Sequence, residues 1–258
     1  MQERHNNRRR YFEELADTCT NFFIPYIKRW HEVAPGMRIL EVGCGEDGNL
    51  LPFSKIGCDV TGIDIASGRI EEAKRFFAEK QAKGRFIAED FLKLKGFEHQ
   101  YDIIICHDVL EHIDDKEVLL SHIGSFLEEG GVIFMSFPAW QMPFGGHQQI
   151  CRSRILSHIP FVHLLPEVLY KGIIRLAEEN DDCLNELLSI RRTRITIEAF
   201  ERLVSHTKLK IQDRTLYLIN PHYKVKFGLT PRRLSSLISS IPYLRNFLSS
   251  SCFYIMRK

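Results

Sequence analysis

An apolar run that leads into a glycine-rich turn constrains the fold of this 258-residue chain more than any other feature. Residues 37–42 are mostly apolar, the turn Gly43-Cys44-Gly45-Glu46-Asp47-Gly48 follows, and an acid, Asp64, ends the next apolar run. Glycine tolerates positive φ and has no Cβ, so the backbone at Gly43 and Gly45 can turn tightly and lie close to a ligand. This arrangement is typical of α/β folds that hold a nucleoside-bearing ligand, whose ribose hydroxyls Asp64 can bind.

Strand-like and helix-like segments alternate up to residue 137. Ser67 and Asp114 are predicted to cap helices, and the apolar run at 103–105 suits a central parallel strand. Strands are predicted at 37–42, 58–63, 85–88, 101–106, 132–137, 208–219 and 251–256. This rhythm predicts an α/β fold: a Rossmann-like, mostly parallel sheet of seven strands with helices on both faces. Ligands then lie at the carboxyl ends of the strands.

The chain is interpreted as a single domain with two insertions. An N-terminal helix (9–33) precedes a cofactor-binding core (37–137), and an insertion or lid (138–192) follows the core. Residues 193–258 form a closing helix and the last strands, and a second insertion (220–250) lies within them. Residues 138–192 are rich in proline, histidine and aromatic residues. Long connections in compact domains usually have a function, so this segment is interpreted as an insertion or lid that covers the bound acceptor. Thr196 is expected to cap the closing helix, and a helix is expected from Pro231.

Composition narrows the function class. The chain has 35 basic and 33 acidic residues and a formal net charge of +2, which does not favour a nucleic-acid partner. Seven cysteines without a C-x-x-C pair favour a reducing cytoplasm. The polar start at 1–6 is not a signal peptide, and no apolar run reaches the roughly 18 residues of a membrane span. We therefore expect a cytoplasmic protein, and the sequence carries no signal for an oligomeric state.

The glycine turn and Asp64 fit a dinucleotide-dependent dehydrogenase as well as a methyltransferase. Three further features favour the methyltransferase. Glu41 places a carboxylate where a cationic amino-acid moiety can meet it, and Asp90 can accept from an adenine amine that Phe91 covers. The third is a dense polar cluster at 107–112, at the end of the fourth predicted strand.

These motifs resemble, in order, those of the class I S-adenosylmethionine-dependent methyltransferases. The matching stretches are LEVGCG at 40–45, GIDI at 62–65, EDF at 89–91, and YDIII at 101–105 with VLEH at 109–112. The resemblance covers residues 37–137 well and implies an antiparallel last strand. The branch that it resembles most is that of the ubiquinone-pathway O-methyltransferases.

The resemblance also implies S-adenosylmethionine as the cofactor, S-adenosylhomocysteine as the product, and a set of roles. The turn of Gly43, Cys44 and Gly45 would line the methionine moiety, Glu41 would hold its amino group, and the backbone at His107 would flank the same end. Asp64 would bind the ribose hydroxyls. The adenine would be contacted by Ile65, Asp90 and Phe91.

Methyl transfer from a sulfonium needs an aligned acceptor and, for a hydroxyl, a base within reach of its proton. The candidate catalytic residues are His107, Asp108, Glu111, His112 and His147. The alternative for Glu111 and His112 is a structural one, in which they fix the loop before the next helix. If 108–112 formed one helical turn, Asp108, Glu111 and His112 would share a face, and with His147 they could hold a divalent metal. This is similar to the E-x-x-E-H pattern of the ubiquinone-pathway O-methyltransferases and of the small-RNA 2′-O-methyltransferases, with Asp108 in place of the first glutamate.

Three functions stay open at this point. The first is transfer of a methyl group to a small-molecule acceptor, on oxygen because bases outnumber any amide-recognition signal. The second is RNA methylation, for which Arg191, Arg192 and Arg194 with Arg232 and Arg233 could form a local basic patch. The third is a non-catalytic cofactor-binding module.

Overall fold

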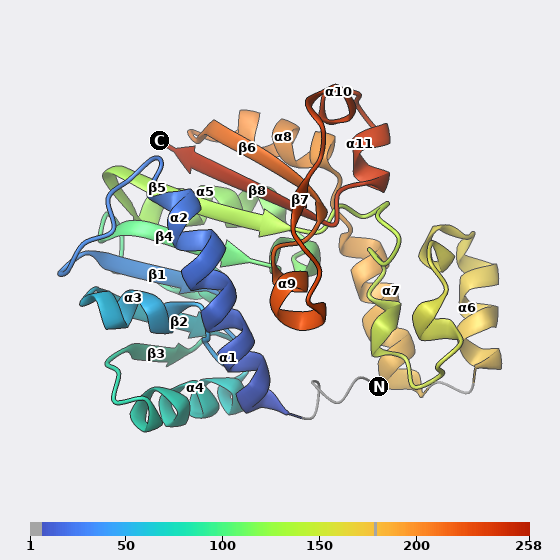
Figure 1. Ribbon diagram of the computed structural model, residues 1–258, viewed down its shortest axis with the longest axis horizontal. Coiled ribbons are helices and arrows are strands. Elements are labelled where there is room, and N and C mark those ends of the chain that lie inside the picture. Colours follow the sequence, from blue (N-terminus) through green and yellow to red (C-terminus); the bar gives the residue numbers. More distant parts are fainter. Residues whose placement is uncertain (1–6, 178–179) are drawn as a thin grey trace.

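A computed structural model describes residues 7–177 and 180–258. The polar start at 1–6 and two acidic residues of the first insertion, Glu178 and Glu179, lie outside the described residues. The described chain forms one mixed sheet with helices on both of its faces (Figure 1). The strands are β1 (Arg38–Val42), β2 (Asp59–Asp64), β3 (Arg85–Ala88), β4 (Tyr101–His107), β5 (Leu127–Phe137), β6 (Lys210–Ile219), β7 (Arg232–Arg233) and β8 (Ser251–Arg257).

The strand order is β3-β2-β1-β4-β5-β8-β6-β7. Strands β1 to β5 pair in parallel, and β8 pairs antiparallel with both β5 and β6. The predicted α/β class and the reversed last strand are therefore confirmed. The predicted count of seven strands is wrong, because β7 adds a two-residue antiparallel strand at the edge of β6. The order reverses between β1 and β4, which is where sheets of this type bind ligands.

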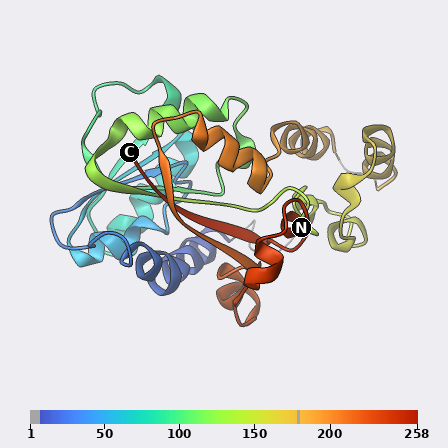
Figure 2. The same ribbon diagram turned by 90° about the horizontal axis from the view of Figure 1, so that it is seen from above.

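Two apolar layers cover the sheet, one on each face (Figure 2). Alternate residues of β4 divide between them: Ile103 and Ile105 face α1 (Arg8–Thr18) and α2 (Ile24–Ile27), while Ile104 and Cys106 face α5 (Lys116–Phe126) and α8 (Ile197–Ser205). The remaining core helices are α3 (Leu50–Ile56) and α4 (Ser67–Glu79). Since a strand's side chains alternate between faces, a run that is apolar throughout has to be covered on both.

Local chemistry corrects three of the predicted helix boundaries. The N-terminal helix ends at Ile27 rather than 33 and contains a π-helical turn, η2 (Cys19–Phe23), immediately before Pro25. Proline lacks a backbone N–H, which accounts for the wider hydrogen bonding at this point. Helix α4 is preceded by Ala66 without a side-chain cap, so Ser67 is its first residue. Asp115, not Asp114, caps α5 by accepting from the backbone of Val118.

The first insertion forms a small helical unit that projects from the carboxyl edge of the sheet (Figure 1). It contains α6 (Glu167–Leu176) and α7 (Asp181–Thr193), with single 3-10 turns η5 (Gln148–Ile150), η6 (Leu156–His158) and η7 (Val162–Leu164) before them. Its apolar core is separate and centres on Tyr170, Ile174 and Leu187. The sequence patterns did not predict α7, although an Asn180 cap, acids in its first turn and arginines in its last are helix signals.

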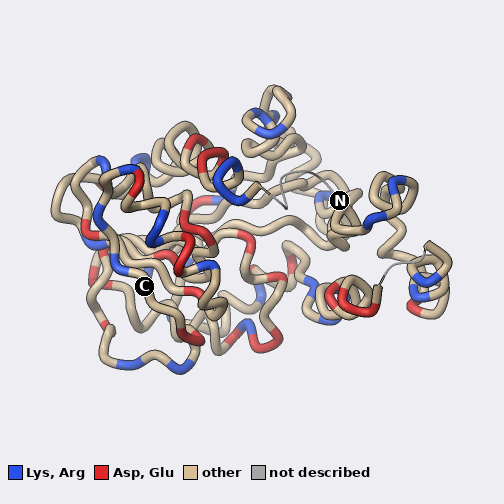
Figure 3. The backbone as a smooth tube through the Cα atoms, turned by 90° about the horizontal axis from the view of Figure 1, so that it is seen from below, with Lys and Arg blue, Asp and Glu red and all other residues tan. Residues whose placement is uncertain are grey.

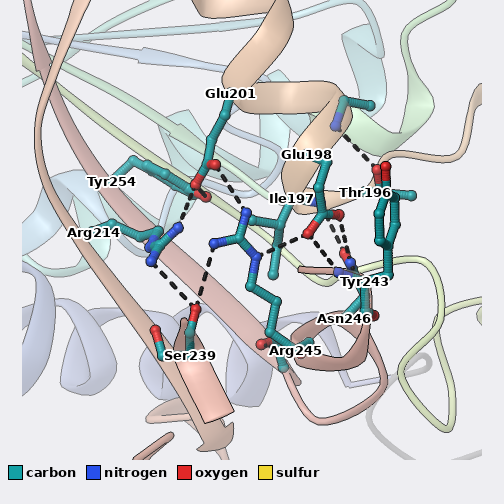
Figure 4. A network of polar contacts seen from close by, with 12 residues as sticks. Thr196, Ile197, Glu198, Glu201, Arg214, Ser239, Tyr243, Arg245, Asn246 and Tyr254 are labelled. Atoms are coloured by element: carbon teal, nitrogen blue, oxygen red, sulfur yellow. Dashed lines mark hydrogen bonds and ion pairs between the residues drawn. The ribbon is translucent and has the colours of Figure 1, made fainter. Parts of the chain in front are cut away.

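The second insertion holds α9 (His222–Phe227), α10 (Ser236–Ser239) and α11 (Leu244–Phe247). The helix expected from Pro231 is wrong, since β7 begins directly after it. Buried charges fix this insertion to α8: Arg245 is 6% exposed and donates to both Glu198 and Glu201, each at 2.9 Å (Figure 4). The predicted cap of α8 is confirmed, because Thr196 accepts from the backbone of Ala199 at 3.1 Å. No helix among the described residues has the length and apolar character to cross a membrane.

Candidate active site

The glycine turn follows β1 and closes against β2. Gly43 and Gly45 have φ of 69° and 54°, and the N–H groups of Gly43 and Cys44 both donate to the carbonyl of Ile63. A Cβ on Gly43 would lie 2.4 Å from a methyl of Val109, so only glycine fits between β1 and the segment after β4. Cys44 itself is buried, 4% exposed. The turn is therefore shaped by the packing of two strand ends as well as by its own residues.

Two buried carboxylic acids lie under this turn. Glu41 is 1% exposed and accepts from the side chain of Asn49 at 2.7 Å through Oε1, while Oε2 has no hydrogen-bond partner. Burial raises the pKa of Glu41 to about 7. Asp47 is fully buried, and burial together with the neighbouring Glu41 raises its pKa well above the usual range. The pair thus holds at least one proton near neutral pH. Sequence reasoning missed Asp47 and Asn49, although both stand within or next to the turn.

Asp64 ends β2 and connects the turn to the start of α4. Its Oδ2 accepts from the N–H of Gly45 at 2.9 Å and its Oδ1 from the N–H of Ala66 at 2.8 Å. The next side chain, Ile65, is 75% exposed. A large apolar side chain left in solvent beside a carboxylate is the arrangement that a flat, hydroxyl-bearing ligand could cover.

Asp90 and Phe91 follow β3. Asp90 caps the 3-10 turn η3 (Phe91–Lys93) by accepting from Leu92 at 3.1 Å, the structural role that such an acid often has. The ring of Phe91 is 7% exposed and packs on His122 and Phe126 with centroids 4.9 and 5.0 Å apart. In this position the ring belongs to the core, which does not favour the predicted stacking over an adenine.

His107 and Asp108 follow each other at the end of β4, with Nδ1 of His107 3.5 Å from Oδ1 of Asp108. The His107 ring packs on Phe23 at 4.9 Å, and its Nδ1 bonds the hydroxyl of Ser136 at 2.5 Å, on the face covered by the N-terminal helix. Asp108 has φ of 52° and an exposed side chain. It therefore lies outside the single 3-10 turn η4 (Leu110–His112), so the helical turn through 108–112 on which the metal hypothesis depends does not form.

Glu111, His112 and His147 come together from two segments. Nε2 of His147 lies 3.9 Å from Oε1 of Glu111, and the rings of His147 and His112 are 5.4 Å apart. Burial raises the pKa of Glu111 well above its usual range and lowers the pKa of His147 to about 3. At neutral pH the imidazole of His147 is therefore neutral, and it lies beside a carboxyl whose ionisation is disfavoured by burial.

Close backbone packing brings His147 to this place. A Cβ on Gly146 would lie 2.2 Å from the Cβ of His163, so the glycine lets the two segments of the first insertion touch. Thr193, at the end of α7, donates to the carbonyl of Glu111, and Lys116 donates to the carbonyl of Thr193. Backbone contacts from α7 thus fix the loop that carries Glu111, whereas neither side-chain oxygen of Glu111 has a hydrogen-bond partner. The Glu111 side chain is therefore left to face His147.

The predicted metal site does not assemble as proposed. Within residues 7–177 and 180–258, no group of three or more histidine, cysteine or acidic side chains is arranged to hold a metal ion. Asp108 has φ of 52° and stands outside the 3-10 turn, although its charge still acts on Glu111 and His112.

Two tyrosines that the sequence patterns did not single out border the site. The Tyr11 hydroxyl interacts electrostatically with Asp108 and Glu46, and its ring meets His222 of α9 edge-on at 6.2 Å. Burial and the Asp108 carboxylate raise the pKa of Tyr223, also on α9. Helix α1 and α9 of the second insertion therefore both lie near the end of β4.

Three of the five arginines considered for nucleic-acid binding make contacts within the chain, and the other two, Arg232 and Arg233, are exposed on β7. Arg192 pairs with Asp114 at 3.1 Å, Arg191 donates to the carbonyl of His163, and Arg194 lies over the Trp140 ring. Basic and acidic residues are interspersed along the described backbone (Figure 3). This distribution does not favour a nucleic-acid surface.

Comparison with known proteins supports one family. The family model described as "Methyltransferase domain" matches residues 7–179. A ubiquinone biosynthesis O-methyltransferase of Coxiella burnetii is 32% identical over 103 residues, which are 39% of this chain and 43% of that protein. A polyketide synthase-nonribosomal peptide synthetase of Phaeosphaeria nodorum is 23% identical over 260 residues, 92% of this chain and 6% of that protein. The chain thus matches less than half the length of these curated relatives.

Solved structures share the fold at low sequence identity. Magnesium protoporphyrin IX methyltransferase from Synechocystis, with bound S-adenosylhomocysteine, has a TM-score of 0.56 at 17% identity and covers 95% of this chain and 84% of its own. A geranyl diphosphate methyltransferase in complex with S-adenosylmethionine has a TM-score of 0.58 at 15% identity and covers 93% and 84%. The chain belongs to the family whose model is described as a methyltransferase domain, and these solved structures share its fold.

Proposed function

We propose that this enzyme transfers a methyl group to a hydroxyl oxygen of a small, largely apolar acceptor, with His147 as the proton acceptor. The observation that carries the proposal is the meeting of His147 with Glu111 at the end of β4, beside the glycine turn. The local similarity to ubiquinone biosynthesis O-methyltransferases supports an oxygen acceptor. The buried Trp140 and Met142, which precede His147, support an apolar one.

The residues of the turn fit the cofactor. Oε2 of Glu41 is a buried oxygen without a hydrogen-bond partner. A Cβ added to Gly45 would meet nothing nearer than Arg69, at 3.7 Å, so a ligand can approach the backbone there. We propose that Glu41 holds the ammonium group, that the turn from Gly43 to Gly45 cradles the methionine chain, and that the backbone at His107 flanks it.

The nucleoside end is assigned to the next two strand ends. We propose that Asp64 binds the ribose hydroxyls, which then compete with its backbone partners Gly45 and Ala66. Ile65 covers the adenine and Asp90 accepts from its amine, while Phe91 contributes through its backbone because its ring is buried.

S-adenosylmethionine supplies a methyl group that is already activated as a sulfonium, so the chain has to align the acceptor, exclude water and remove one proton. The neutral imidazole of His147 can accept that proton at any physiological pH. An oxygen that gains a methyl group while still protonated becomes a strong acid. A base of low pKa therefore suffices if the proton leaves as the new bond forms. Residues 138–192 act in this proposal as a lid that brings the base to the acceptor.

The test is a screen with S-adenosylmethionine labelled in its methyl group. Phenols and catechols with apolar tails are compared with carboxylic acids and amines of similar size, and the product is identified by mass spectrometry. We expect a methyl ether from a phenol. His158, an exposed histidine of the same insertion, provides the matched control, because His158→Ala should transfer at the wild-type rate.

Two results would redirect the proposal. Methylation at carbon or nitrogen would remove the need for His147 as a base. Label that enters only a cell extract and is lost on nuclease treatment would favour an RNA acceptor, and cofactor binding without turnover on any extract would favour a binding module.

A further inference from the structure

Two cysteines meet inside the first insertion. Cys151 follows η5 and Cys183 lies in the first turn of α7, and their Sγ atoms are 3.9 Å apart although 32 positions separate them in sequence. Cys151 is fully buried, whereas Cys183 is only partly buried. Because a disulfide needs a sulfur separation of about 2.05 Å, the two atoms have to approach by roughly 2 Å, a movement within the reach of side-chain rotation and a small loop shift.

The surroundings of the two sulfurs suit thiol chemistry. Tyr170 packs in the same apolar cluster, its hydroxyl has no hydrogen-bond partner, and it interacts electrostatically with both cysteines. Burial raises the pKa of Tyr170, so the phenol keeps its proton and can donate to a sulfur anion. The guanidinium of Arg191 lies 5.5 Å from the centre of the Tyr170 ring. A hydrogen-bond donor close to a thiol stabilises the thiolate that disulfide exchange requires, and the Arg191 charge next to Tyr170 makes its phenol a better donor.

We propose that Cys151 and Cys183 form a reversible disulfide that holds the first insertion in the arrangement described above. The thiolate of Cys183, the more accessible of the two, attacks one sulfur of glutathione disulfide and releases one glutathione thiolate. The thiolate of Cys151 then attacks the Cys183 sulfur of this mixed disulfide and releases the second. Two cysteine thiols are oxidised to one disulfide, one glutathione disulfide is reduced to two glutathiones, and the two cysteine protons end on those two molecules.

The position of the pair gives the bond a consequence for the site. Cys151 follows the turn that begins at His147, and α7 leads from Cys183 to Thr193, which donates to the carbonyl of Glu111. A bond between the two cysteines therefore connects the segment that carries His147 to the helix that contacts Glu111. It should limit the opening of this insertion without touching the turns after β1 and β2.

The first experiment counts thiols and does not depend on any acceptor. The purified full-length protein is incubated with glutathione disulfide, denatured without reductant and alkylated. We expect five of its seven cysteines to be alkylated, a mass loss of two hydrogens, a peptide that joins 151 to 183, and full reversal by dithiothreitol. Seven alkylated cysteines, or a cross-link between any other pair, would overturn the proposal.

The second experiment measures the opening of the insertion. Trypsin sites at Arg152, Arg154 and Arg175 are exposed and lie inside the loop that the bond would close. We expect the oxidised protein to be cut there at least several-fold more slowly than the reduced protein, and Cys183→Ser to be cut at one rate under both conditions. Equal cleavage rates of the oxidised and reduced wild type, with the disulfide mapped as present, would show that the bond does not hold the insertion. The affinity for S-adenosylhomocysteine should be the same in both forms.

Discussion

The two halves of the carboxyl edge of the sheet hold their polar groups in different ways. In the cofactor half, the partners of Glu41 and Asp64 lie in or next to the short turns that follow β1 and β2: Asn49 for Glu41, and Gly45 and Ala66 for Asp64. In the acceptor half, Glu111 meets a histidine that arrives from an insertion beyond β5. Short turns fix the polar groups of the cofactor half directly to the strand ends, whereas the acceptor half depends on how two long insertions pack on the sheet. A mutation in one half should therefore change cofactor affinity or methyl transfer, but not both.

The largest effect is expected at His147. His147→Ala removes the proposed proton acceptor, so methyl transfer should fall roughly 1,000-fold, within the range for general bases. The affinity for S-adenosylhomocysteine, measured by calorimetry, should stay within about a factor of two of wild type, since the mutation lies in the acceptor half. Equal losses in turnover and cofactor affinity would show that the two halves are not separable in this way.

Arg245 tests whether the second insertion is held mainly by its buried charges. Arg245→Ala leaves Glu198 and Glu201 without their shared partner, and removal of one member of a buried network is strongly destabilising. We expect the free energy of unfolding in urea to fall by about 3 kcal/mol. This is the lower end of the range for a broken buried ion pair, because Glu201 is partly exposed and stays partly solvated. Arg232→Ala, an exposed arginine of the same insertion, should change it by less than about 0.5 kcal/mol. Similar losses in both variants would mean that the charge network has no special role.

Asp64 probes the cofactor half. Asp64→Ala removes the acceptor proposed for the ribose and also releases the N–H of Gly45. We expect the affinity for S-adenosylhomocysteine to fall about 30-fold, as for the loss of one or two hydrogen bonds to a charged group. Asp64→Asn keeps one oxygen and should lose less. Unchanged affinity in Asp64→Ala would remove the ribose assignment.

The smallest effect concerns pH. Glu41 has a pKa of about 7 in the free protein, and an ammonium group favours its ionised form. Cofactor affinity should therefore rise as pH increases through 7, by about tenfold between pH 6 and 8, and binding near pH 7 should release a proton. Calorimetry in two buffers of different ionisation enthalpy measures that proton. Glu41→Gln should bind with an affinity independent of pH in this range, and a pH slope that persists in this variant would assign the titration to another group.

The same division separates what the sequence could predict from what it could not. The apolar run at 103–105 and the glycine turn fold as they do because of residues that are neighbours in sequence, so the sheet and the cofactor half could be predicted. The same local reading could not see that Asp108 takes a positive φ, because that depends on packing between the ends of β4 and β5. Nor could it place the ring of Phe91, which is exposed or buried according to whether α5 packs on it.

The polar network around Arg245 also has a dynamic consequence. It connects α8, α11 and, through the hydroxyl of Tyr254, the strand β8, so a partial opening of any one of them would expose unpaired charge. We expect the amide hydrogens of these three elements to exchange with solvent as one cooperative unit. The apolar unit around Tyr170 has its own small core and should exchange earlier. The insertion that carries His147 would then open to solvent more often than α8, α11 and β8, which the Arg245 network holds together.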